Sequence, residues 1–167
     1  MVGDPVSSVH VVLARREHAD FVLGLVPELV AFGPPPPRHR VPQMIDVDTR
    51  VIRRALEGRS EGAIVFVAED ANGTPLGFTH LCPDHDYYTE GPCGHIADLV
   101  VAPAARRRGV GEALLAAAEQ WARDRGYALL TLNVFLENSH ARALYDRTGF
   151  NPELIRYVKP LARREDR

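Results

Sequence analysis

Apolar and polar residues recur along this chain with two different periods, which divide it into helices and strands. Apolar residues three or four positions apart predict helices over residues 17–26, 46–57, 111–125 and 138–147. Short apolar or alternating runs predict strands over residues 9–14, 63–68, 75–81, 96–101, 128–135 and 155–158. The order β-α-α-β-β-β-α-β-α-β is that of a mixed α/β sheet, not of a strict βα repeat.

Residues that cap or break helices mark where the predicted helices begin and end. Pro27 is expected to end or kink the first helix, because proline lacks the backbone N–H that a helix interior needs. Asp46 is expected to cap the second helix at its start, and Gly58 to stop it. Gly126 and Gly149 are expected to close the third and fourth helices.

The segments between these elements carry signals of their own. Ala71-Asn72-Gly73 predicts a hairpin turn between two strands. Residues 33–37, a glycine followed by four prolines, are expected to form an exposed, stiff connection that borders a binding site. Residues 83–94 are predicted to be an irregular loop.

Composition limits the classes of function that the chain can have. A chain of 167 residues, 46% hydrophobic and 25% charged, is expected to form a single soluble domain over residues 1–167. Its formal net charge of −2 argues against nucleic-acid binding. No apolar run is long enough for a signal peptide or a membrane span, and two cysteines are too few for a disulfide framework, so we expect a cytoplasmic protein.

A loop with two glycines stands between a predicted strand and the helix that follows it. Gly109 and Gly111 allow an anion to approach the backbone, and the start of a helix supplies unpaired N–H groups. The arginines of the run Arg106–Arg108 add positive charge, so the loop predicts a site for a diphosphate-containing ligand. It is not a nucleotide P-loop, and Leu114 stands where a dinucleotide fingerprint needs its third glycine.

Three motifs follow one another between residues 95 and 161. They are Val101-x-Pro103 with Arg106-x-x-Gly109-x-Gly111, then Leu130-x-Leu132-x-Val134 with Asn138-x-x-Ala141, and then Leu144-Tyr145 with Gly149-Phe150. In this order and spacing they resemble the GNAT superfamily of N-acetyltransferases. The first half of the chain matches that superfamily only in its order of elements. One departure is Arg107, because glycine often follows the arginine of this loop in the superfamily.

The resemblance implies a fold, a cosubstrate and a set of contacts. The fold is a mixed, mostly antiparallel sheet flanked by helices, with a central pair of strands that splay apart. The cosubstrate is acetyl-CoA, whose pantetheine arm would lie in the gap and whose diphosphate would lie on the loop amides. Backbone N–H groups near Val100 and Val101 would polarise the thioester carbonyl. The residues expected to contact acetyl-CoA are Val100, Val101, Arg106, Arg107, Arg108, Gly109, Val110, Gly111, Asn138 and Tyr145. The resemblance also suggests a homodimer.

Transfer of an acetyl group to an amine needs a base, because a primary amine with a pKa near ~10.4 is protonated at neutral pH. His95 and Asp98 are the alternative bases, and strand alternation places them on opposite faces unless a bulge intervenes. An alternative role for Asp98 is to bind a cationic acceptor. Tyr145 is the candidate acid that protonates the departing thiolate.

The prediction from sequence is therefore an acetyl-CoA-dependent N-acetyltransferase that acts on a small amine. Acidic and aromatic residues within 83–94 favour a cationic acceptor. The alternatives are an acetyltransferase of peptide or protein amines and a CoA-binding sensor without transferase activity. Cys82 and Cys93, with the nearby aspartates and histidines, lack the spacing of a zinc site, so no metal is expected.

Overall fold

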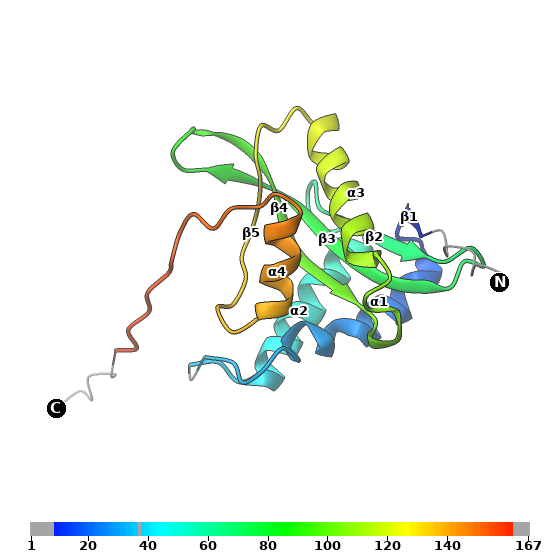
Figure 1. Cartoon of the computed structure of the whole chain (residues 1–167), viewed down its shortest axis with the longest axis horizontal. Coiled ribbons are helices and arrows are strands. Elements are labelled where there is room, and N and C mark those ends of the chain that lie inside the picture. Colours follow the sequence, from blue (N-terminus) through cyan, green and yellow to red (C-terminus); the bar gives the residue numbers. More distant parts are fainter. Residues whose placement is uncertain (1–8, 37, 162–167) are drawn as a thin grey trace, which may run out of the picture.

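A sheet of five strands carries helices on both faces in the described residues, 9–36 and 38–161, of this computed structural model (Figure 1). Across the sheet the strands are β1 (His10–Leu13), β2 (Ile64–Glu69), β3 (Pro75–Asp86), β4 (Gly91–Val101) and β5 (Leu130–Leu132). The first four strands are antiparallel to their neighbours, whereas β5 runs parallel to β4. The predicted mixed, mostly antiparallel sheet is confirmed.

Helices cover both faces of the sheet. Successive strand residues point to opposite faces, and each face carries apolar side chains that the helices bury. One face carries the short turn η1 (Arg16–His18), α1 (Ala19–Leu25), η2 (Val26–Val30) and α2 (Val41–Leu56). The other face carries α3 (Val110–Asp124), which follows the turn η3 (Pro103–Ala105), and α4 (Ser139–Arg147). Val67 and Phe78 are fully buried under the first layer, and Leu81 packs with Leu115 under the second.

The predicted helix ends are correct in part. Gly58, Gly126 and Gly149 all have positive φ angles and end their helices as expected. The predicted start of the second helix is wrong, because α2 begins at Val41 and Asp46 lies inside it. Pro42, which follows Val41, is tolerated there since the first turn of a helix needs no internal N–H donor.

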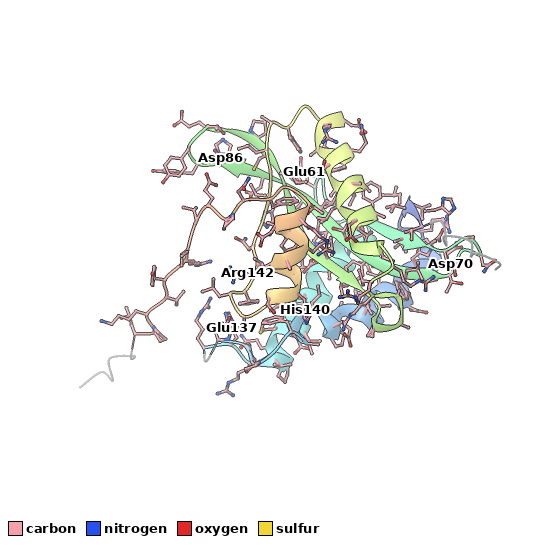
Figure 2. All side chains as sticks on the ribbon, in the orientation of Figure 1. Glu61, Asp70, Asp86, Glu137, His140 and Arg142 are labelled. Carbon is pink, nitrogen blue, oxygen red and sulfur yellow. The ribbon has the colours of Figure 1, made fainter. Side chains whose placement is uncertain are left out.

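The segment predicted as an irregular loop, 83–94, is instead a hairpin arm. β3 and β4 continue as a ladder that pairs Pro83 with Gly94 and ends at the pair Asp86–Gly91. Figure 2 shows Asp86 on this arm, which extends beyond the helices. The sequence concealed the strands because the arm is mostly exposed and has no apolar face to bury.

The two predicted strands near the C-terminus also differ from the structure. The strand predicted over 128–135 is confined to β5, Leu130–Leu132. The strand predicted over 155–158 is absent from the described residues, where 151–161 form no regular element and Leu154, Ile155 and Tyr157 are exposed. This segment runs away from the sheet (Figure 1), so its apolar pattern has no neighbouring strand to pair with.

A bulge in β4 changes which side chains share a face. His80 of β3 is opposite Asp98, but the next residue, Leu81, is opposite Ile96, so Ala97 is an extra residue. Beyond the bulge, His95 is opposite Cys82, two residues from His80 on β3. Because residues two apart on a strand share a face, His95 and Asp98 lie on the same face, which is the one covered by α2. The expectation that they lie on opposite faces is wrong for this reason.

β4 and β5 touch over three residues and then separate. Gly94–Ile96 pairs with Leu130–Leu132, and β4 continues to Val101 with no parallel partner in the described chain. Gly94 allows the close packing, because a Cβ there would lie 2.8 Å from a ring atom of Trp121. The predicted splayed pair of central strands is confirmed.

Candidate active site

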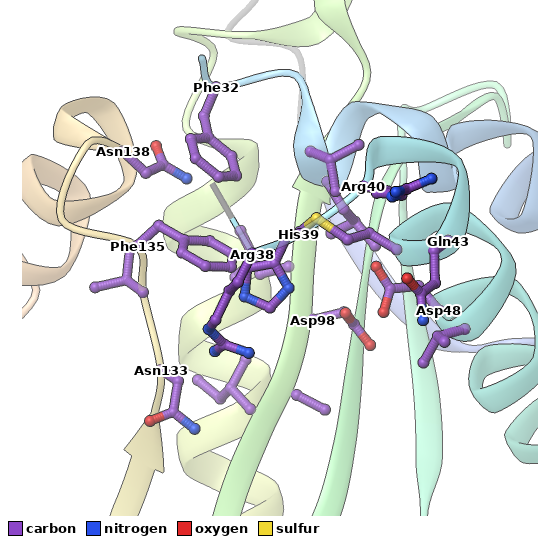
Figure 3. A pocket seen from close by; sticks show the side chains of 18 of the residues that line it. Phe32, Arg38, His39, Arg40, Gln43, Asp48, Asp98, Asn133, Phe135 and Asn138 are labelled. Atoms are coloured by element: carbon purple, nitrogen blue, oxygen red, sulfur yellow. The ribbon is translucent and has the colours of Figure 1, made fainter. Parts of the chain in front are cut away.

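A cavity of about 610 Å³ opens where β4 and the chain after β5 separate. This volume is typical of a small-molecule site. Its walls come from β4, α2, α4, the chain after β5 and the segment before α2 (Figure 3). The polar and aromatic residues that line it are Phe32, Arg38, His39, Arg40, Gln43, Asp48, Asp98, Asn133, Phe135, Asn138 and Tyr145.

The proline-rich connection borders this cavity, as the sequence predicted. Phe32 precedes the prolines and Arg38 follows them, and both line the cavity. The ring of Phe32 stacks on that of Phe135 with centroids 5.1 Å apart, which holds this connection against the chain after β5. Pro37 itself lies outside the described residues.

Asp98 is the carboxylate at the centre of the cavity wall (Figure 3). Its Oδ2 accepts a hydrogen bond from Nδ1–H of His80 at 2.9 Å. His80 is only 2% exposed, so this bond from the neighbouring strand β3 fixes the direction of the Asp98 carboxylate. Sequence reasoning missed His80 because one histidine in an apolar strand carries no motif.

His95 lies on the same face as Asp98 but is not among the residues that line the cavity. Its Nδ1 is 2.8 Å from Oγ1 of Thr131, across the short β4–β5 pairing. Burial lowers the pKa of His95 despite the charges of Asp84 and Asp98, so the neutral ring is favoured at pH 7. Of the two alternative bases, the structure therefore brings Asp98 to the cavity.

A second carboxyl group, Asp48 on α2, also lines the cavity. Burial, and then the negative charge of Asp98, raise its pKa from 3.8 to about 6. The sequence did not indicate Asp48, because an acidic residue inside an amphipathic helix usually faces solvent.

Tyr145 and Asn138, both predicted from the sequence, line the cavity from α4 and its cap. Burial, and then the charge of Asp98, raise the pKa of Tyr145, which keeps the phenol protonated. Its ring meets Phe150 edge-on, with centroids 5.8 Å apart. Oδ1 of Asn138 accepts a hydrogen bond from the N–H of Ala141 at 3.1 Å, so Asn138 caps α4 as expected.

The two glycines of the loop before α3 have different tasks. Gly109 is the N-cap of α3 with φ +76, and a Cβ there would meet no atom within 4 Å. A Cβ on Gly111 would lie 2.9 Å from Cδ2 of Leu144, so this glycine lets α3 and α4 pack closely. No side chain caps α3 in the described residues, and its first internal bond runs from Ala113 N–H to Gly109 O. The amides of Val110 and Gly111 have no partner within the helix, so they suit an anion.

The three arginines of this loop have separate environments. Arg106 pairs with Glu28 of η2 through a 2.7 Å contact between Nη2 and Oε2. Arg107 has φ +61, which explains why glycine is favoured at this position. The charge of Arg108 lowers the pKa of Asp70, although hydrogen bonds from the backbone of Thr74 and Asn72 do so more strongly.

The backbone of β4 presents N–H groups to the gap beside β5. The N–H of Ala102 donates to Leu76 O at 2.8 Å, which sets the phase of the antiparallel ladder. Because such ladders alternate, the amide of Val100 points to β3, and those of Leu99 and Val101 point away from it. Leu99 also lines the cavity, a position that the sequence prediction did not include.

The described residues contain neither a candidate metal site nor a helix that could cross a membrane. Across 9–36 and 38–161 there is no group of three His, Cys, Asp or Glu side chains that could hold a metal ion. Cys82 and Cys93 are free thiols. None of the helices in these ranges combines the length and the apolarity that crossing a membrane requires.

Comparisons with known proteins agree with this architecture. A sequence model of the acetyltransferase (GNAT) family matches residues 31–150. An uncharacterized N-acetyltransferase of Bacillus subtilis is 35% identical over 91 residues, which are 54% of this chain and 60% of that protein. An aminoglycoside N(6')-acetyltransferase type 1 of Stenotrophomonas maltophilia is 37% identical over 94 residues, 54% of this chain and 61% of that protein.

These matches span about 60% of the length of the curated relatives. The likeness of fold extends further. A solved structure of the aminoglycoside N-acetyltransferase AAC(6')-Iy in complex with CoA has a TM-score of 0.70 and 22% identity. That similarity covers 98% of this chain and 99% of the other.

Proposed function

Because the chain belongs to the acetyltransferase (GNAT) family, we propose that it transfers the acetyl group of acetyl-CoA to a primary amine of a small molecule. The observation that carries this proposal is the cavity at the β4–β5 splay. Asp98 of β4 and Tyr145 of α4 both line this cavity, and the outward amides of β4 border the gap beside β5.

Acetyl-CoA fits the features of this chain as a substrate. The amides of Val110 and Gly111 at the start of α3 and the open space at Gly109 suit the diphosphate. The gap beside β4 suits the pantetheine arm, and the outward amides of Leu99 and Val101 suit the thioester oxygen, where negative charge develops in the transition state. CoA is the ligand of AAC(6')-Iy, whose fold is similar.

The chemistry uses a base and an acid that both line the cavity. Asp98 accepts the proton of the ammonium group, and the free amine attacks the thioester carbonyl. The tetrahedral intermediate collapses, the C–S bond breaks and the thiolate leaves. Tyr145 donates its phenolic proton to that thiolate and regains one from solvent. His80 holds Asp98 through the 2.9 Å hydrogen bond and is a positioning residue.

The test of this function measures thiol release from acetyl-CoA with a panel of amines, together with the affinity for acetyl-CoA. Gly109→Glu places bulk and negative charge among the amides of α3, so we expect loss of acetyl-CoA binding by at least 100-fold with the fold retained. Gly73→Glu is the matched control, since Gly73 has φ +79 and equally open surroundings in a distant turn.

Two results would contradict the proposal. Unchanged affinity of Gly109→Glu for acetyl-CoA would remove the diphosphate from this loop. Binding of acetyl-CoA by the unaltered protein without release of thiol in the presence of any amine would indicate a CoA-binding sensor instead of a transferase.

A further inference from the structure

The cavity carries charges of both signs. Asp98 projects from β4 at its centre, and Asp48 lies on the α2 side (Figure 3). The guanidinium of Arg38 lies on the opposite side of Asp98, toward Asn133 (Figure 3). A ligand that spans the cavity therefore meets carboxylates in one part and a guanidinium in another.

Arg38 is an exposed arginine that lines the cavity and, like several other arginines, has no carboxylate partner among the described residues. Arg106, Arg123 and Arg147 each form an ion pair with a glutamate. Arg38 forms no such pair with any described residue, although Asp98 lines the same cavity. A guanidinium has five donors in a planar fork that matches carboxylate and phosphate groups, so its position at a concave wall indicates an anionic ligand group.

His39 supplies a second and independent observation. Its Nε2 is buried and has no hydrogen-bond partner among the described residues, and the side chain lines the cavity. The ring is held edge-on to Phe135, with centroids 5.9 Å apart. A buried polar atom without a partner costs free energy, which a polar group of a ligand would offset.

We propose that the acceptor is an amine that also carries an anionic group, a carboxylate, phosphate or phosphonate, which Arg38 binds while Asp98 receives the amine. This inference rests on the proposed acetyl transfer and names the class of its acceptor. Two arginines in the cavity, Arg38 and Arg40, oppose a polycationic acceptor such as an aminoglycoside, because each would repel its ammonium groups.

The experiment compares matched pairs of acceptors. One pair is an amino acid and its amide, and the other is an aminoalkylphosphonate and the alkylamine of equal length. A polycationic aminoglycoside is the third probe. We expect kcat/KM to be at least tenfold higher for the anionic member of one pair than for its neutral partner. The pair that shows the difference identifies the anionic group.

The variant Arg38→Gln assigns the effect to its residue. It should lower kcat/KM for the anionic amine by 10- to 100-fold, leave the neutral partner within about twofold, and leave the KM for acetyl-CoA unchanged. Arg53→Gln is the control, because Arg53 is an exposed arginine of α2 that does not line the cavity.

Three outcomes would overturn the inference. Preference for the aminoglycoside or for the neutral amines would show that no anionic group is recognised. Equal losses on both members of a pair in Arg38→Gln would show a general role for the residue. A raised KM for acetyl-CoA in that variant would assign Arg38 to a CoA phosphate. All three require turnover by the unaltered protein, so they differ from failure of the proposed transfer, which would appear as no thiol release with any probe.

Discussion

Asp48 provides a quantitative test of the electrostatics of the cavity. Burial and the charge of Asp98 raise its pKa from 3.8 to about 6 in the folded chain. The folded state therefore holds the proton more tightly than the unfolded state between these two values. Stability from this group is present at low pH and is lost as the pH rises from about 4 to above 6. Replacing Asp48 with asparagine removes the group that loses its proton.

The magnitude follows from the size of the shift. A rise of roughly two pKa units corresponds to about 3 kcal/mol, and the partial exposure of Asp48 reduces this to about 1–2 kcal/mol. We expect Asp48→Asn to raise the free energy of unfolding by about that amount at pH 8 and to change it little at pH 4. We also expect a higher KM for the acceptor amine, because substitutions that stabilise a binding site often impair its function.

The assay is urea denaturation of the unaltered chain and the variant at pH 4, 6 and 8, with equal slopes confirming comparable unfolded states. Asp46→Asn is the control, since Asp46 is exposed on the same helix and does not line the cavity. A gain at pH 8 that equals the gain at pH 4, or that also appears in the control, would refute the reasoning.

Three further predictions concern the site and its packing. Tyr145→Phe should lower kcat by about 100-fold and leave the KM for acetyl-CoA within about twofold, and Tyr127→Phe should change neither; equal turnover in steady-state assays would remove Tyr145 from the acid role. Asp98→Asn should lower kcat by at least about 100-fold and His95→Gln by less than about tenfold; the reverse order would make His95 the base. Gly111→Ala should destabilise the chain in thermal unfolding, because the new Cβ would lie 2.9 Å from Cδ2 of Leu144. In a Leu144→Ala background, which removes this contact, the same substitution should cost less, with a coupling free energy of about 1 kcal/mol. Additive effects of the two substitutions would contradict the packing role.

Much of the fold was predictable because its signals are local. The glycine at the end of each long helix and the Asn72-Gly73 turn act within a few residues, so their positions follow from the sequence. The start of α2 was not predictable in this way, because Pro42 breaks a helix interior but is accepted in a first turn. The hairpin arm was concealed because pairing of exposed strands leaves no apolar period.

The candidate site was predictable only where it coincides with the motifs. Asn138 and Tyr145 were found through the second and third motifs, respectively, and both line the cavity. Asp48 and His80 are brought to Asp98 from α2 and β3, and such contacts between distant segments leave no pattern in the chain. The relation between His95 and Asp98 depends on a bulge, which no sequence signal marked.

That bulge constrains how β4 can change in length. Side chains alternate between the two faces of the sheet along β4, and the extra residue Ala97 shifts this alternation by one position. Deleting Ala97 would leave His80 opposite Asp98 and Leu81 opposite Ile96, so the ladder would become regular and both β4 side chains would keep their faces. β4 can therefore lose this one residue without reversing its faces, whereas loss of one residue on either side, with the bulge kept, would turn over the remainder of that half.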